Sequence, residues 1–332
     1  MKKKIILLPA IYLLLTIICY GQINPDHSYE ELREKALNYF PDQADSTIII
    51  MEYAFEKFPD EYLNATTILA QVYTRIGELS KATDIWETGI QKGYAYGLNN
   101  TIYHQYFEDN SEFQILVEEE DKLLSTMHIE HKVLLPQNYN KKKGYPLLYI
   151  FHGNNRNIDK SEVVWQSPLM SEEFITVFLQ SYMPSSSEDF RWVADDDKTR
   201  KEFREIYDQI LNKYSVDRKK IVFAGMSAGG RKAVELVMNN YFPASGMVLN
   251  CPVIPTDIND EMIKSFVDKN RKLAIITGEN DFALENQKDL VSKIIKLNGQ
   301  AIIEVNKGLG HNFSDNFTEQ LEKNLRWVIK YR

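Results

Sequence analysis

Residues 221–229 read IVFAGMSAG and decide the fold of this chain. The first four are apolar and favour a buried strand, while residues 228–239 favour a helix. Between them, Gly225 to Gly229 matches the pattern G-x-S-x-G, in which a sharp strand-to-helix turn lifts a serine hydroxyl clear of the sheet. The N-terminus of the helix would supply N–H donors beside that hydroxyl. Ser227 is therefore predicted to be a nucleophile. The alternative is a glycine-rich turn that contains a serine by chance.

The chain around this turn alternates short apolar runs with amphipathic helices. That alternation predicts an α/β fold with a mostly parallel sheet that helices cover on both faces. An alternating run at 128–135 predicts an edge strand, and the continuous apolar run 147–151 predicts a strand buried on both faces. The other expected strands are 174–179, 246–250, 273–277 and 301–305, and the other expected helices are 199–214 and 317–329.

The segment 152–155, His-Gly-Asn-Asn, follows the predicted strand 147–151. Folds of this kind place half of an oxyanion hole at such a position. The backbone N–H groups of Asn154 and Ala228 are predicted to form this hole, that is, a pair of donors for the negative charge of a tetrahedral intermediate. His152 is predicted to bond the backbone of its own loop, with a role as general base as the alternative.

The general base is sought among the six histidines of the chain. His27 and His104 lie in a helical segment, and His128 and His131 lie on the expected edge strand. His311 sits in a loop after the last predicted strand. There, a neutral imidazole could take the serine proton and return it to the leaving group. The alternative for His311 is a surface histidine without a catalytic role.

An acid that orients this histidine is expected between Ser227 and His311, at the end of a strand. The predicted strand 273–277 runs into the sequence Gly-Glu-Asn-Asp, which ends at Asp281. Asp281 is the predicted orienting acid, because a short side chain on a fixed loop suits the role. Glu279 is the substitute. The order along the chain is then serine, aspartate, histidine.

With these side chains, residues 127–332 resemble an alpha/beta-hydrolase, most closely the predicted esterases of the phospholipase/carboxylesterase type. Segment 134–153 is also similar to secreted esterases, in which a Pro-x-x-Tyr loop leads to a strand that ends in His-Gly. The resemblance implies a serine hydrolase that works through an acyl-enzyme and needs no metal and no other cofactor. The sequence departs from lipases where Asn154 and Asn155 replace glycines and Arg156 follows, which bears on the shape and polarity of the acyl pocket.

Residues 28–120 carry helical patterns and no convincing strand. We expect a tetratricopeptide-like helical region at 22–122 and an alpha/beta-hydrolase catalytic domain at 123–332. The helices would offer a groove to a protein partner, or they would merely pack on the catalytic domain. The residues at the spacing of a tetratricopeptide helix pair are Leu69, Ala70, Tyr73, Gly77, Ala82 and Trp86.

Residues 1–21 are predicted to be a secretory signal peptide. Three lysines occupy positions 2–4, and the apolar run 5–18 is shorter than the about 20 residues that span a bilayer. Cleavage after Gly21 would export the protein to the periplasm or beyond and leave no stable membrane span. A lipoprotein anchored through Cys19 and an uncleaved anchor are the alternatives.

Charge and cysteine content exclude several classes of protein. The 332 residues include 39 Lys+Arg and 47 Asp+Glu, so the formal charge is 39 − 47 = −8. Nucleic acid is not an expected partner, because phosphate neutralisation needs a basic face.

Loss of the signal removes three lysines and no acid, which gives 36 − 47 = −11. Cys251 is then the only cysteine, so neither an intramolecular disulfide nor a zinc site of paired cysteines is expected.

The expected site is open to solvent. The interval between Pro252 and Lys272 is too short for a large cap domain. The loops 154–165 and 182–197 would bound the site, which suits a water-soluble small-molecule ester or the end of a polymer. The candidate pocket aromatics, for which packing is the competing role, are Trp165, Tyr182 and Trp192.

The leading hypothesis is an exported serine esterase. A serine peptidase that acts on short peptides has the same fold and the same three catalytic groups, so the sequence does not separate it from an esterase. A helical-repeat adaptor with an inert hydrolase domain is an alternative from another class. The complete set of Ser227, Asp281 and His311 argues against the adaptor.

Overall fold

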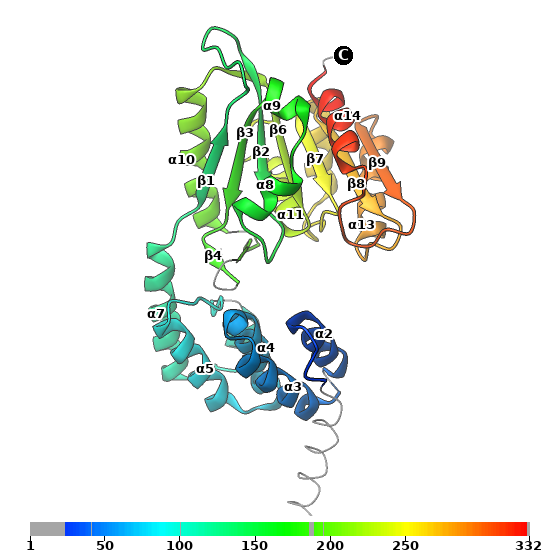
Figure 1. Cartoon of the computed structure of the whole chain (residues 1–332). Helices are drawn as coiled ribbons and strands as arrows, with labels where there is room; N and C mark the ends of the chain where they lie inside the picture. Colours follow the sequence, from blue (N-terminus) through cyan, green and yellow to red (C-terminus); the bar gives the residue numbers. More distant parts are fainter. Residues whose placement is uncertain (1–23, 41, 100, 186–188, 195, 331–332) are drawn as a thin grey trace, which may run out of the picture. The chain divides into compact units, whose positions relative to one another are not determined.

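The computed structural model describes residues 24–330 except 41, 100, 186–188 and 195. They fall into two compact units, one within Met1–Met127 and Pro184–Ser187 and the other within His128–Met183 and Glu188–Arg332 (Figure 1). The predicted signal segment, with Cys19, lies outside the described residues. In the part of the chain that the structure describes, no helix combines the length and the apolar composition needed to cross a bilayer.

The first unit is helical, as predicted for residues 28–120. α4 (Tyr62–Ile76) ends at Gly77, whose φ of 83° suits glycine, and α5 (Leu79–Gln91) begins directly afterwards. Neighbouring helices pack around a shared apolar core in which Trp86 is fully buried. The tetratricopeptide assignment stays a prediction. The other helices are α2 (Tyr29–Tyr39), α3 (Ala44–Lys57), the 3₁₀ turn η1 (Pro59–Glu61), α6 (Thr101–His104) and α7 (Ser111–Thr126).

A buried carboxylate fixes the loop that follows α5. Glu120 of α7 is almost completely buried. Its carboxylate accepts hydrogen bonds from the backbone N–H groups of Tyr96, Gly97 and Leu98, at 3.0 Å for Gly97 and 2.6 Å for Leu98. These donors lie outside helices and strands, so a charged acceptor supplies the partner that regular structure would provide. Glu120 therefore has a structural role in the first unit.

The second unit is built on a seven-stranded sheet with the order β1-β3-β2-β6-β7-β8-β9. β1 pairs antiparallel with β3 at the edge, and the other pairs are parallel. The prediction of a mostly parallel sheet with an edge strand at 128–135 is confirmed. The strands are β1 (Glu130–Leu134), β2 (Tyr145–Phe151), β3 (Ile175–Gln180), β6 (Val216–Met226), β7 (Gly246–Asn250), β8 (Lys272–Gly278) and β9 (Gln300–Asn306).

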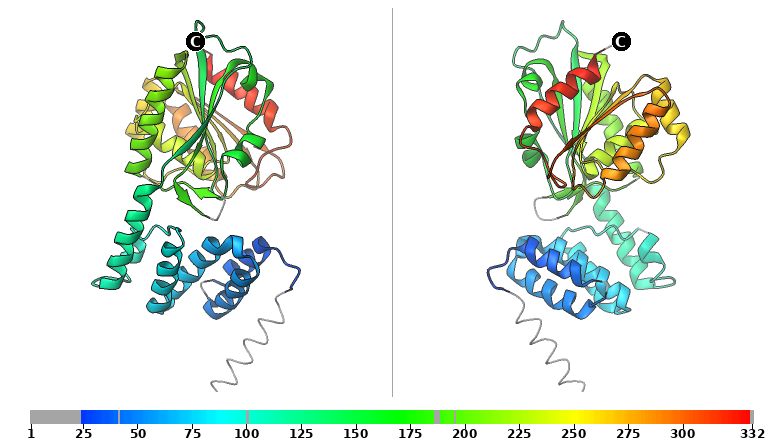
Figure 2. Two further views of the ribbon diagram at one scale, coloured as in Figure 1. Left: turned by 60° about the vertical axis from the view of Figure 1, so that its left-hand side comes forward. Right: turned by 90° about the vertical axis from the view of Figure 1, so that its right-hand side faces the viewer.

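Helices cover both faces of this sheet (Figure 2). They are α8 (Ile158–Val164), α9 (Pro168–Glu173), α10 (Asp197–Lys213), α11 (Ala228–Met238), α12 (Asp260–Asp268), α13 (Leu284–Lys296) and α14 (Phe317–Ile329). Leu169 of α9 and Leu321 of α14 belong to the same buried cluster as Val222 of β6. Phe203 of α10 lies edge-on to Phe223 of β6, with ring centroids 5.7 Å apart. Neighbouring residues of β6 thus face opposite layers, which explains the continuous apolar run at 221–224 within this strand.

Several short elements carry no clear signal in the sequence. α8 and α9 have seven and six residues, too few turns for a helical period to stand out, and side-chain caps at Asn157 and Ser167 begin them. Met183–Pro184 and Phe190–Arg191 form the small ribbon β4–β5. The interval between β7 and β8 holds α12 alone, so the expected lack of a large cap domain there is confirmed.

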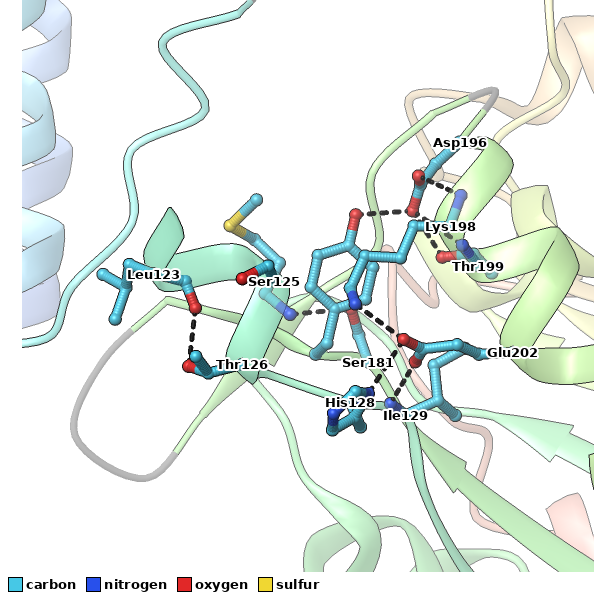
Figure 3. Close-up of polar contacts among 12 residues, drawn as sticks. Leu123, Ser125, Thr126, His128, Ile129, Ser181, Asp196, Lys198, Thr199 and Glu202 are labelled. Atoms are coloured by element: carbon cyan, nitrogen blue, oxygen red, sulfur yellow. Dashed lines mark hydrogen bonds and ion pairs between the residues drawn. The ribbon is translucent and has the colours of Figure 1, made fainter. Parts of the chain in front are cut away.

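One carboxylate holds the start of β1 to α10 (Figure 3). Glu202 accepts hydrogen bonds from the backbone N–H of Ile129 at 2.8 Å and from Nζ of Lys198 at 2.6 Å. Its other contact is with Nδ1 of His128, at 3.0 Å. Asp196 is the N-cap of α10 and accepts a hydrogen bond from the backbone N–H of Lys198 at 3.0 Å. These carboxylates therefore fix an edge of the second unit.

Candidate active site

Ser227 occupies a strained turn between β6 and α11. Its φ of 53° and ψ of −119° place a residue other than glycine in the left-handed region, which costs on the order of 1–3 kcal/mol. Neighbouring elements hold the backbone there. The N–H of Ser227 donates to the carbonyl of Asn250 at 3.1 Å, and its carbonyl accepts from the N–H of Arg231 at 2.9 Å. The turn is thus fixed by β7 on one side and by α11 on the other.

The two glycines of the motif allow this turn because backbone segments meet there. A Cβ on Gly225 would lie 2.6 Å from the carbonyl carbon of Gly229. A Cβ on Gly229 would lie 2.2 Å from the carbonyl oxygens of Phe151 and His152. No side chain fits at either distance, so the start of α11 packs directly on the end of β2. This contact brings the loop after β2 next to Ser227.

Asp281 and His311 come together from the ends of β8 and β9. Nδ1 of His311 lies 3.1 Å from Oδ2 of Asp281. The carboxylate also accepts hydrogen bonds from the backbone N–H of Ala283 at 2.7 Å and the hydroxyl of Thr277 at 3.1 Å. Burial raises the pKa of Asp281, but the hydrogen bonds from Ala283, Cys251 and His311 outweigh it and lower the pKa below its usual value. Asp281 is therefore an ionised acceptor that fixes the histidine ring.

The partner on Nδ1 assigns the tautomer of His311. Because Nδ1–H donates to Asp281, Nε2 carries a lone pair in the neutral ring. This Nε2 is buried, and no other described residue forms a hydrogen bond with it. His311 and Ser227 line the same cavity, of about 420 Å³. The full lining is Gly153, Asn154, Asn155, Arg156, Lys160, Met226, Ser227 and His311.

The two predicted oxyanion donors flank this cavity. Ala228 is the first residue of α11, where N–H groups have no acceptor within the helix. A Cβ on Gly153 would lie 3.8 Å from Cβ of Ser227, so the loop that carries Asn154 runs beside the nucleophile. Within the described chain, no hydrogen bond uses the backbone N–H of Asn154 or of Ala228. The side-chain oxygen of Asn154 accepts the N–H of Trp192 at 3.1 Å, which orders this loop.

His152 is bound by backbone groups on both ring nitrogens. Nδ1–H donates to the carbonyl of Gly153 at 2.6 Å, and Nε2 accepts the N–H of Ser181 at 3.1 Å. Burial lowers the pKa of this fully buried ring to about 4. Its lone pair is already used, so His152 does not serve as a base here. The structural role predicted for it is confirmed.

The predicted pocket aromatics do not line the cavity. Trp165, Tyr182 and Trp192 are all buried, and Nε1 of Trp192 donates to the carbonyl of His152 at 2.9 Å. The exposed aromatic beside the site is instead Phe282, which was not among the predicted pocket aromatics. Its side chain is 75% exposed, and its ring centroid lies 4.5 Å from that of His311. Its position directly after the predicted acid was the only signal for it.

One group of side chains at the site has the donor types of a metal centre. The ligand atoms of Cys251, Asp281 and His311 lie within 4.8 Å of one another. Burial raises the pKa of the Cys251 thiol to about 12, and hydrogen bonding to Asp281 adds to this. Metal binding needs the thiolate, whereas this environment favours the neutral thiol. The cluster therefore fits a hydrogen-bonded support for Asp281 better than it fits a metal.

The strand order, the antiparallel edge strand and the serine turn after the central strand together define the α/β-hydrolase fold. No family model and no curated protein matches the chain. An uncharacterized protein from Bacillus cereus ATCC 10987 is similar in structure, with 20% identity, a TM-score of 0.53, and 91% of this chain and 99% of that chain covered. This coverage exceeds the second unit alone, so the likeness of fold extends into the helical unit.

Two esterases of known structure are also similar to the chain. One is a ferulic acid esterase, with 18% identity, a TM-score of 0.48, and 60% of this chain and 92% of that chain covered. The other is the Bacillus cereus carboxylesterase, with 17% identity, a TM-score of 0.48, and 62% and 98% covered.

Proposed function

We propose that this protein is a serine hydrolase that cleaves carboxylic esters through an acyl-enzyme on Ser227. The arrangement of His311 carries the proposal. Its Nδ1–H is bonded to Asp281, and its Nε2 is free of partners among the described residues in the cavity that Ser227 also lines. A histidine held in this tautomer is ready to accept the serine proton.

In the proposed reaction, Oγ of Ser227 attacks the ester carbonyl carbon while Nε2 of His311 takes the hydroxyl proton. The N–H groups of Asn154 and Ala228 donate to the oxyanion that forms, and each such donor is worth about 2.7–4 kcal/mol of barrier. Collapse of the intermediate breaks the bond to the alcohol, which leaves with the proton from His311. Water then attacks the carbonyl carbon of the acyl-enzyme while Nε2 of His311 takes its proton. Collapse of this second intermediate releases the carboxylic acid, and His311 returns the proton to Oγ of Ser227. Asp281 keeps the ring oriented and stabilises its charged form.

The test uses a fluorophosphonate probe and a panel of acyl esters with the full chain. Ser227→Ala should abolish both labelling and turnover. Ser171→Ala is the matched control, because Ser171 lies on α9 and its hydroxyl donates to the carbonyl of Pro168 at 2.9 Å, away from the cavity. Turnover that survives in Ser227→Ala would remove the proposal. A folded wild type that the probe does not label would favour the adaptor hypothesis.

Nitrophenyl acetate and amino-acyl nitroanilides separate an esterase from a peptidase of the same fold. We expect hydrolysis of the ester and little cleavage of the amide. The same assay tests the alternative that Cys251, Asp281 and His311 bind a metal ion. The serine mechanism predicts full activity after exhaustive treatment with EDTA, whereas a loss that zinc restores would support a metal centre instead.

We also propose that the protein is exported and that the helical unit serves a protein partner. The basic and then apolar start of the sequence supports export. Deletion of residues 1–21 should retain the protein inside the producing cell, as fractionation with an antibody would show. Equal export of the truncated and full-length chains would contradict the signal assignment.

A further inference from the structure

We propose that Arg156 binds an anionic oxygen group, a carboxylate or a phosphate, on the ester that the enzyme hydrolyses. The inference deepens the proposed function and rests on it. It names a substrate class: esters with a negative charge a few bonds from the scissile carbonyl. It follows from the charges that line the cavity of Ser227 and His311.

The cavity is positively charged by its side chains. Arg156 and Lys160 line it, and none of its described lining residues is acidic. Nζ of Lys160 is already paired, at 2.8 Å and 2.7 Å from the two carboxylate oxygens of Asp189. The charge of Lys160 is therefore balanced within the protein. The unbalanced charge in the cavity is the guanidinium of Arg156.

The guanidinium of Arg156 has no acceptor among the residues that the structure describes. Its Cζ lies 5.8 Å from the centroid of the Phe313 ring. No described residue forms an ion pair or a hydrogen bond with it. Half-buried arginines are normally bonded to oxygen acceptors, because five N–H groups lose part of their hydration. A planar fork of donors that faces a cavity without an acceptor is suited to an anionic oxygen group from a ligand.

The position of Arg156 places such a group close to the reaction. A Cβ on Gly153 would lie 3.8 Å from Cδ of Arg156 and 3.8 Å from Cβ of Ser227. The stem of the arginine and the nucleophile thus flank the same glycine. The backbone of Arg156 is also fixed, because its carbonyl accepts the N–H of Phe190 at 3.0 Å. The cation is therefore held beside the nucleophile by the loop that carries the predicted oxyanion donor.

The net charge of the chain helps to separate a local effect of Arg156 from long-range electrostatic attraction. At −8, the chain as a whole repels anions, so long-range attraction does not explain a preference for an acidic ester. A single cation inside the cavity would act at short range, where water and salt screen it less. The expected selectivity is thus a property of the site.

The experiment compares esters that differ in one charge. Monoethyl succinate against ethyl succinamate places the charge on the acyl side. The pair 4-acetoxybenzoate and 4-acetoxybenzamide places it on the leaving group, and 4-acetoxyphenyl phosphate tests phosphate against carboxylate. In at least one pair, the wild type should have the higher kcat/KM for the anionic ester. Arg156→Gln should reduce the anionic-to-neutral ratio about tenfold or more, and Arg156→Lys should retain part of it.

Arg218→Gln is the matched control, because it makes the same change at an exposed arginine that lines a different cavity. It should leave the ratio unchanged. If Arg156→Gln has the wild-type ratio in every pair, the inference is overturned even though Ser227-dependent hydrolysis persists. If no ester is hydrolysed in a Ser227-dependent way, the proposed function fails instead. Circular dichroism and labelling of Arg156→Gln by the fluorophosphonate probe show that the variant is folded.

Discussion

The two ends of the parallel strands use unusual backbone conformations for different reasons. At the amino ends, the residues with positive φ are asparagines that follow the ends of α11, α12 and α13, where asparagine is tolerated. At the carboxyl ends they include Asn155 as well, but Ser227 and Cys251, with φ of 53° and 45°, have no such local preference. A positive φ therefore marks the site only where residue type and helix-end geometry leave it unexplained. The asparagines are Asn240, Asn270 and Asn298.

The arginines at the two ends of the strands differ in their hydrogen-bond partners. Arg271, at the amino end, is buried and donates to the carbonyl of Val237 at 2.6 Å and to Oδ1 of Asn240 at 2.8 Å. It thereby holds the end of α11 and the turn that follows it. Arg156, at the carboxyl end, has no such acceptor in the described part of the chain. The amino end also has the larger cavity, about 730 Å³ against about 420 Å³, so volume alone does not locate the chemistry.

The largest effect should follow from His311→Ala at the carboxyl end. Loss of the base should lower kcat on an acyl ester by roughly 10⁶-fold, as far as removal of the nucleophile would. The unfolding midpoint should change little, because Asp281 loses the hydrogen bond from His311 but keeps those from Ala283 and Thr277. Steady-state kinetics and thermal unfolding check both statements. The control is His131→Ala on the edge strand, and equal losses in the two variants would contradict the assignment.

Asp281→Asn should give the next largest effect. The amide can donate to Nδ1 and favour the wrong tautomer, so kcat should fall by about 10⁴-fold while some activity remains. Glu279→Gln is the control, because its carboxylate accepts the N–H of Gly308 at 2.9 Å rather than the histidine. A larger loss in Glu279→Gln would reassign the orienting acid. Both variants are measured with the same ester at pH 7.

Most of the fold follows from sequence periodicity, and the errors have a physical pattern. β7 and α14 coincide with the predicted ranges 246–250 and 317–329. β6 begins at Val216, earlier than the predicted 221. The prediction missed residues 216–220 because they are largely polar and lie outside the buried layer, although their backbone is still extended. Apolar runs thus report the buried part of a strand, whereas its full length depends on the neighbouring strand.

The features of the site that follow from the order of elements along the chain were predictable. Those that depend on which side chains are exposed to the cavity were not. Asp281 and His311 follow adjacent parallel strands, so their proximity could be inferred from the order of elements. The cavity-lining position of Arg156 and the exposed ring of Phe282 depend on which neighbours pack around them. Trp165 was a pocket candidate by residue type, yet it packs against Phe317 in the core. Composition does not reveal which side of a loop faces the cavity.

The pH dependence of stability should report His152, which lies beneath the site. Burial lowers its pKa from 6.5 to about 4. Between these values the unfolded chain takes up a proton that the folded chain does not. The free energy of unfolding therefore falls as pH drops from 6.5 to 4, by about 3 kcal/mol in total. Urea unfolding of wild type and His152→Gln over this range isolates the contribution. The advantage of the wild type should shrink toward low pH, and parallel curves would contradict the prediction.

Arg271→Gln should lower stability and leave activity unchanged, whereas His311→Ala should lower activity and leave stability almost unchanged. Shortening this side chain removes its hydrogen bonds to the buried carbonyls of Val237 and Phe242, which should lower the free energy of unfolding by about 2 kcal/mol. The kcat/KM for a neutral ester should stay at the wild-type value, because the residue lies at the other end of the strands. Urea unfolding and ester kinetics test the two parts. A loss of activity without a loss of stability would overturn the distinction between the two ends.

The smallest effect tests the strain itself. Ser227→Gly places the residue that prefers positive φ at the serine turn. Relief of on the order of 1–3 kcal/mol of strain, less about 0.5–1 kcal/mol for the greater freedom of glycine in the unfolded chain, should raise the free energy of unfolding by about 1 kcal/mol. Asn270→Gly, at φ 53° as well, should change it by less than about 0.5 kcal/mol, because asparagine already tolerates that conformation. Urea unfolding of both variants, with wild type as reference, measures the difference. Equal gains would mean that the serine turn stores no more strain than an ordinary helix end.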